Sequence, residues 1–162
     1  MFDVLVYVYE HYWRGDSCPE LPLLGRKLSA AGFDPDEIQQ ALSWLAGLNN
    51  AAQHADLIEL QPSQPPSAYA PSPHSMRVYS DEEQRHLGAA CLGFLTFLES
   101  AGVISAQMRE IIVDRAMAVT DHPVSLDDLK IIVLMVFWSA GIEPDALVLD
   151  ELCDDSGDRL AH

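Results

Sequence analysis

The sequence predicts a mainly α-helical fold with a winged-helix-like N-terminal unit, made of three helices and a short β ribbon, followed by a C-terminal bundle of three to four helices. Apolar residues recur at helical spacing through most of the 162 residues, Ser and Asp residues stand at helix-start positions, and one proline-rich stretch divides the chain. We expect the winged-helix-like unit over residues 1–79, including a proline-rich loop at 61–75, a helical unit over 80–153 and an acidic tail over 154–162.

The first segment, residues 2–14, is rich in β-branched and aromatic side chains, which favour a strand locally. However, Asp3 and Glu10 fall on one helical face, opposite Leu5, Val6 and Tyr9. This amphipathic arrangement predicts a helix.

Two further helices joined by a tight turn are predicted between residues 20 and 49, as in a helix-turn-helix. Apolar residues from Leu21 onward stop at Gly32, which suits the left-handed conformation that ends helices. Asp34 as N-cap and Pro35 at the first helical position then start the next helix. Its apolar positions form one stripe, which consists of Ile38, Ala41, Leu42, Leu45 and Leu48.

The composition changes after Ala51, and five of the ten prolines lie between Gln61 and Ser75 together with four serines. This stretch is typical of a loop. The short segments that flank it, Leu57–Leu60 and Met76–Tyr79, are predicted to pair as an antiparallel ribbon with the loop at its tip.

Three helices are predicted in the second half. Ser80 and Glu83 form a capping box at the start of the first, and Ser125 with Asp128 does the same for the third. Between them, apolar residues from Met108 to Val119 recur at helical spacing. The run from 131 to 138 is apolar on all sides, which fits a central helix or a buried strand; its cap favours the helix. Pro144 is expected to open a last short helix.

Composition limits the classes of function. Nine Lys and Arg against 25 Asp and Glu give a formal charge of −16, which disfavours direct nucleic-acid binding and anionic membranes and favours basic partners or plain solubility. The three cysteines have no paired spacing and no basic leader precedes the first helix, so we expect a cytoplasmic protein. The strongly apolar uncharged runs Leu87–Leu98 and Ile131–Ile142 have 12 residues each, too few to cross a membrane, which takes about 20.

The candidate chemical groups have ordinary structural explanations. Glu83 and His86 have the spacing of metal sites in helical bundles, but Glu83 is already needed for its cap. Cys91 lies in an apolar run, as a core thiol would. Arg109, Arg115 and Lys130 could form a small basic face, although such charges usually only solvate a surface. No catalytic motif is recognised, and we expect no enzyme activity, cofactor or metal.

The helix after Gly32 corresponds to a recognition helix, yet its outward positions are polar or acidic and no Lys or Arg occurs between Lys27 and Arg77. We therefore expect a surface for a protein, with Trp44 as an exposed aromatic. The candidate partner surface consists of Asp36, Glu37, Gln40, Trp44, Asp150, Asp154 and Asp155.

The chain resembles the Smg family of small bacterial proteins over nearly its whole length. Similar stretches are MFDVLVYVYE, AGFDPDEIQQALSWL, SMRVYS, CLGFLTFLE, REIIVDRA and SLDDLKIIVLMVFW, in that order. The central loop is richer in proline than is typical of the family. The resemblance implies a bacterial cytoplasmic protein whose activity is not established, with no catalytic residues to carry over. Family genes often lie beside genes for DNA-processing and topoisomerase proteins.

These observations favour a non-enzymatic protein-interaction or regulatory protein in a DNA-processing context. Its expected partner is a basic protein, one that itself handles DNA. The alternative is a DNA-associated winged-helix factor, or an acidic competitor of DNA on a basic protein. Direct contact with nucleic acid or membrane is not expected.

Overall fold

The computed structural model describes residues 1–12, 20–59, 77–144 and 148, and for 53–59 it describes the backbone alone. In this part of the chain there are six helices and no strand. They are α1 (Phe2–Tyr12), α2 (Leu21–Ala31), α3 (Pro35–Glu59), α4 (Asp81–Ser100), α5 (Ala106–Met117) and α6 (Leu126–Ser139). The prediction of a mainly α-helical fold is confirmed.

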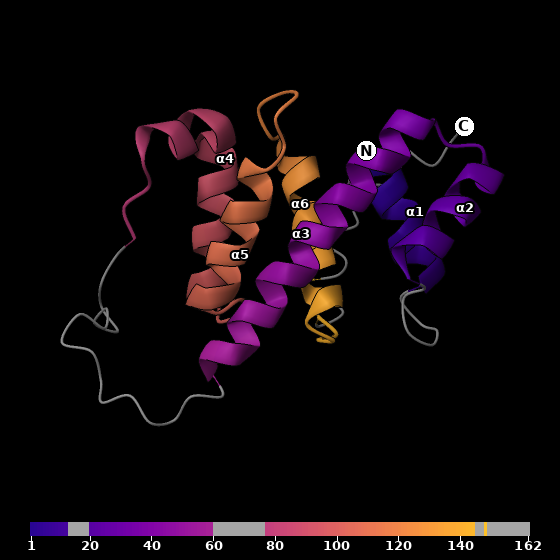
Figure 1. Cartoon of the computed structure of the whole chain (residues 1–162). Helices are drawn as coiled ribbons and strands as arrows, with labels where there is room; N and C mark the ends of the chain where they lie inside the picture. Colours follow the sequence, from indigo (N-terminus) through magenta and orange to yellow (C-terminus); the bar gives the residue numbers. More distant parts are fainter. Residues whose placement is uncertain (13–19, 60–76, 145–147, 149–162) are drawn as a thin grey trace.

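Helix α6 lies at the centre of the arrangement, between α1 on one side and α5 and α4 on the other, and α3 crosses diagonally in front of it in Figure 1. Its residues from Leu129 to Phe137 are all at most 6% exposed. A helix that is apolar on every side must be surrounded by other elements. The predicted central helix is therefore present, and its Ser125 capping box is formed as expected.

One hydrophobic cluster joins the helices of both halves of the chain. Val4, Leu5 and Val8 of α1 are fully buried, and α1 packs against α6 and α3. Helix α3 in turn packs against α2, α5 and α6. The division into units at 1–79, 80–153 and 154–162 stays a prediction, and the first two of these units share this cluster.

The predicted tight turn between α2 and α3 is present. Gly32 ends α2 with a φ of 94°, and its N–H donates to the carbonyl of Ser29. The Asp34 side chain then accepts a hydrogen bond from the backbone N–H of Asp36 (2.9 Å) at the start of α3. Phe33 and Ile38 both pack against the core, as a hydrophobic staple would.

The predicted β ribbon, and with it the winged-helix-like architecture, is wrong. Residues 57–59 belong to α3, which runs 25 residues to Glu59, and residues 77–80 form no strand. No proline or glycine lies between Leu48 and Gln61 to stop the helix, so the backbone hydrogen bonds continue past the end of the apolar stripe. Leu60, Met76 and the loop 61–75 lie outside the described residues, as do the tail and nearly all of the short helix expected after Pro144.

Helix α4 is kinked at Gly88, a feature that the helical pattern of the sequence does not predict. The φ and ψ of Gly88 are 69° and 170°, a region that essentially only glycine adopts. Near this kink the carbonyl of His86 accepts a hydrogen bond from the N–H of Val124 (3.0 Å). The Cys91 thiol lies 3.5 Å from the Val124 carbonyl. The kink therefore fastens α4 to the connection between α5 and α6.

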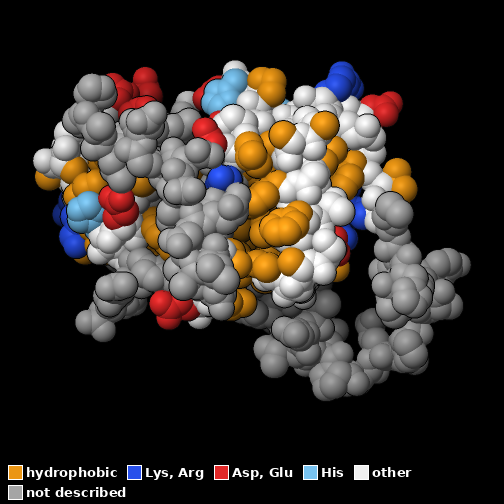
Figure 2. Space-filling model, turned by 180° about the vertical axis from the view of Figure 1, so that it is seen from behind, with side chains coloured by type: hydrophobic (Ala, Val, Ile, Leu, Met, Phe, Trp, Pro, Cys, Tyr) orange, Lys and Arg blue, Asp and Glu red, His pale blue; other side chains and the backbone are white. Residues whose placement is uncertain are grey.

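Hydrophobic side chains also gather on the face opposite to the view of Figure 1 (Figure 2). Among the described residues, the large apolar side chains with the greatest exposure are Val78 at 87% and Phe97 at 59%. No helix among the described residues is long and apolar enough to cross a membrane.

Candidate functional site

The candidate partner surface is only partly as predicted. Asp36 and Gln40 are exposed on α3, and Glu37 is partly exposed and pairs with the N-terminal ammonium group of Met1 (3.3 Å). The expectation of an exposed Trp44 is wrong, because this residue is 4% exposed. Three acidic members of the predicted surface lie outside the described residues, namely Asp150, Asp154 and Asp155.

Trp44 is buried because it belongs to the apolar stripe of α3. Ala41, Trp44, Leu45 and Leu48 have the i, i+3, i+4, i+7 spacing of one helical face, and all four are buried. The indole N–H of Trp44 donates to the backbone carbonyl of Arg115 on α5 (2.9 Å), so its polar atom is satisfied. This i, i+3, i+4, i+7 spacing is the sequence signal for a buried Trp44.

The outward residues of α3 line a cleft between this helix and the end of α5. The cleft has a volume of about 440 Å³. Sites for small ligands commonly measure roughly 300–1,000 Å³. The lining residues are Met1, Gln39, Gln40, Ser43, Trp44, Arg115, Ala118, Val119, Thr120 and Asp121.

Each of the two cations in the lining has a carboxylate of its own. The ammonium group of Met1 pairs with Glu37, and the guanidinium of Arg115 pairs with its neighbour Asp114 at 2.7 Å. Arg115 lies so close to Gly47 of α3 that a Cβ at Gly47 would come within 1.8 Å of its guanidinium. The missing side chain of Gly47 therefore lets α5 present this arginine against α3.

The third charged residue of the lining, Asp121, is bound differently. Its Oδ2 accepts a hydrogen bond from the side-chain amide of Gln40 at 3.3 Å, which is long for such a bond. Asp121 is exposed and lies in the connection after α5, far from α3 in the sequence. Only the packing of α3 against α5 brings it to Gln40 and Trp44, so spacing along the chain gave no signal for it.

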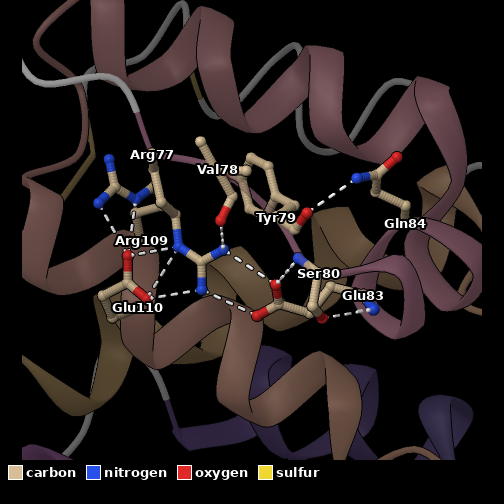
Figure 3. Close-up of polar contacts among 8 residues, drawn as sticks. All are labelled: Arg77, Val78, Tyr79, Ser80, Glu83, Gln84, Arg109 and Glu110. Carbon is tan, nitrogen blue, oxygen red and sulfur yellow. Dashed lines mark hydrogen bonds and ion pairs between the residues drawn. The ribbon is translucent and has the colours of Figure 1, made fainter.

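A network of ion pairs surrounds Arg77, just before α4 (Figure 3). The Arg77 guanidinium donates to both oxygens of Glu83 (2.8 and 3.0 Å) and of Glu110 on α5 (2.8 to 3.1 Å). Its charge also lies 4.4 Å from the ring centre of Tyr79. Arg109 joins the network by pairing with Glu110 and Glu99. These contacts fasten the start of α4 to α5.

The network lowers the pKa of its carboxylates Glu83 and Glu110. The hydrogen bonds from Arg77 and from the backbone N–H of Ser80 lower the pKa of Glu83 to about 2. Burial acts to raise the pKa of Glu110, but the hydrogen bonds from Arg77 and Arg109 outweigh it and the pKa is lowered. Glu83 also completes the capping box with Ser80. Both carboxylates are thus held in the charged form as parts of a structural tie.

The other chemical candidates have structural partners. The ring of His86 lies 3.2 Å from the carbonyl of Ala116, and the carboxylate of Glu83 accepts from Arg77 and from the backbone N–H of Ser80. Burial raises the pKa of the Cys91 thiol to about 11, and the charge of Asp128 adds to this effect. Within the described residues, no three His, Cys, Asp or Glu side chains gather in a way that could hold a metal ion.

The predicted basic face of Arg109, Arg115 and Lys130 is not an open one. The two arginines are paired with acidic side chains on α4 and α5, and Lys130 is 5% exposed on α6. A free phosphate group would have to compete with carboxylates already bound to the arginines.

Comparison with known proteins places the whole chain in one family. The model of the family described as "Protein of unknown function (DUF494)" matches residues 1–162. The chain is 56% identical to the Protein Smg homolog of Methylibium petroleiphilum and 58% identical to that of Leptothrix cholodnii, over the full length of each. It is 46% identical to the Protein Smg homolog of Bordetella pertussis, again over both full lengths. No solved structure matches the chain. The chain therefore belongs to the DUF494 family, the family of the Smg homologs.

Proposed function

We propose that the protein is a non-enzymatic interaction protein that binds a basic protein partner, one that itself handles DNA. The proposal rests on one observation: several cationic side chains that could offset the acidic charge are paired within the chain or buried. Arg77, Arg109 and Arg115 are bound to carboxylates of the same chain, and Lys130 is buried. The chain has only nine Lys and Arg against 25 acids, so the surface offered to a partner is strongly acidic.

Such a surface acts mainly on the rate of association. A body of charge −16 raises the local concentration of cationic proteins and steers their approach. On a partner that handles DNA, it would occupy the surface that phosphates otherwise contact. We propose that this competition with DNA is its regulatory effect.

The proposal is tested with the full chain, tagged and purified from a native host together with the proteins that bind it. The association rate with the recovered partner is then measured by surface plasmon resonance at about 50 mM and about 300 mM salt. We expect the rate to fall steeply at the higher salt, because screening weakens steering. A rate that does not change with salt would contradict the proposal.

A second arm tests the competition. Duplex DNA is added to the preformed complex, and release of the partner is followed by gel filtration. We expect DNA to displace the acidic protein as its concentration rises. Simultaneous binding of both at saturation would remove the competitive effect while leaving the interaction itself intact.

A further inference from the structure

In the cleft between α3 and α5, the cations are paired with carboxylates, but within the described residues the carboxylate of Asp121 is not paired with a cation. The ammonium group of Met1 and the guanidinium of Arg115 are each neutralised by a carboxylate, from Glu37 and Asp114. Asp121 is matched by an uncharged amide, that of Gln40. A carboxylate that accepts from an amide keeps its negative charge, so the lining favours a cationic group at Asp121.

The geometry around Asp121 suits a planar cation with several donors. The Gln40 amide contacts Oδ2 of Asp121 at 3.3 Å. A carboxylate has two oxygens and about four acceptor positions, so a guanidinium can bind it through two parallel hydrogen bonds. The hydroxyl groups of Ser43 and Thr120 and the amide oxygen of Gln39, which line the same cleft, can accept from the remaining N–H groups.

The walls of the cleft can also accommodate the aliphatic part of such a side chain. Trp44 reaches the cleft with only a small edge, since it is 4% exposed, and Ala118 in the same lining is exposed. Arginine carries an apolar stem of three methylene groups, which can pack on such apolar groups while the charged head reaches a carboxylate. A volume of about 440 Å³ exceeds what one such side chain needs and leaves space for the backbone that carries it.

We propose that this cleft receives an arginine side chain of the basic partner, with Asp121 as the counter-ion of its guanidinium. This inference rests on the proposed function and names the contact that makes the binding specific. The general acidity of the surface attracts any basic protein, whereas the cleft selects one that presents an arginine on a protruding segment.

The cleft is tested directly with a small probe, N-acetyl-arginine amide, titrated into the ¹⁵N-labelled full chain. The indole N–H signal of Trp44, assigned with Trp44→Phe, and the side-chain amide of Gln40 should shift with saturation. N-acetyl-citrulline amide, which has the same shape without the charge, should produce no saturable shift. An equal response to both probes would overturn the assignment of a cation site.

Asp121→Asn supplies the matched variant, with Glu10→Gln as a control that removes the same charge from an exposed position on α1. We expect Asp121→Asn to weaken probe binding about tenfold or more, as for loss of a charged hydrogen-bond partner, and Glu10→Gln to leave it unchanged. Equal affinity of the two variants would contradict a role for Asp121. Because Asp121 is exposed, both variants should melt at the temperature of the unmodified chain.

The same pair of variants separates this inference from the proposed function. If the basic partner binds Asp121→Asn as tightly as Glu10→Gln, the cleft is not its contact, although the acidic interaction stands. If no basic partner binds at all, the proposed function fails, and the arginine probe alone decides whether the cleft binds a guanidinium. With a known partner, Arg→Ala substitutions in its protruding segments should reproduce the loss seen with Asp121→Asn.

Discussion

Single residues determine where helix α2 ends and where helix α4 begins. At Gly32 a φ of 94° allows the chain to reverse between α2 and α3. A Cβ added there would meet nothing within 4 Å, so space is not the constraint. The constraint is the left-handed backbone, which most residues adopt only at a cost. At the start of α4, Ser80 and Glu83 satisfy each other's backbone N–H groups.

Replacing Gly32 by Val should therefore destabilise the protein by about 1 kcal/mol or more, since β-branched residues tolerate a positive φ least. Gly32→Asn is the matched control, because asparagine adopts the left-handed conformation more readily, and it should cost clearly less. Urea denaturation measures both. Equal stability of Gly32→Val and the unmodified chain would contradict the turn as observed.

Acid should weaken the protein through Glu83. Its pKa in the folded protein is about 2, below the ordinary value of 4.5, so the ionised carboxylate stabilises the fold above about pH 4.5. This contribution is lost as the pH falls from 4.5 towards 2, because protonation then removes the bond to Arg77. We expect Glu83→Gln to flatten the fall in unfolding free energy across that window, whereas Glu82→Gln, an exposed neighbour, should not. Urea titrations at several pH values would show the slopes.

At the scale of elements, the kink at Gly88 interrupts the regular helical backbone of α4. It sets the first turns of α4 at an angle to the remainder of the helix, which runs alongside α5 (Figure 1). The carbonyl of His86 then bonds to Val124 instead of continuing the helical pattern. Because Val124 precedes the capping box of α6, the kink helps to fix where the central helix begins.

We expect Gly88→Ala to destabilise the protein by about 1 to 3 kcal/mol, since alanine is strained at a φ of 69° and a ψ of 170°. Gly93→Ala is the control on the same helix: it has no positive φ, and its Cβ would meet nothing within 4 Å. That variant should gain up to about 1 kcal/mol, because alanine favours a helix interior. Faster hydrogen exchange at the Val124 amide in Gly88→Ala would locate the effect. Equal melting temperatures of the two variants would contradict the structural role of the kink.

At the scale of the whole molecule, the net charge determines which partners are attracted and which are repelled. The net charge of −16 opposes phosphate backbones, and three of the arginines that could offset it are engaged in ion pairs. The same charge has no bearing on the choice of fold, which depends on the burial of the apolar faces around α6.

The protein alone should therefore not bind nucleic acid. Gel-shift titrations with duplex and single-stranded DNA at about 50 mM salt, where counterion release favours binding strongly, should show no complex at submicromolar concentrations. A DNA-binding protein of similar size serves as a positive control in the same buffer. Submicromolar binding of either form of DNA would contradict this prediction.

The sequence by itself determined the local features of this protein. The capping boxes at Ser80 and Ser125, the stop at Gly32 and the apolar run of α6 depend on contacts between residues a few positions apart, so they could be read directly. The outward positions of α3 from Asp36 to Ser43 followed from helical periodicity in the same way. The family could be recognised for a similar reason, since its motifs are contiguous.

Only the tertiary structure decided the rest, because it depends on residues far apart in the chain. Helix α3 continues past its apolar stripe through the residues predicted as the first strand of the ribbon. Trp44 belongs to that stripe and is buried against α5. The same packing brings Asp121 to Gln40, 81 positions away, and forms the cleft. Periodicity indicates that a helical face is apolar, but the element that covers it is settled by the free energy of burying all faces together.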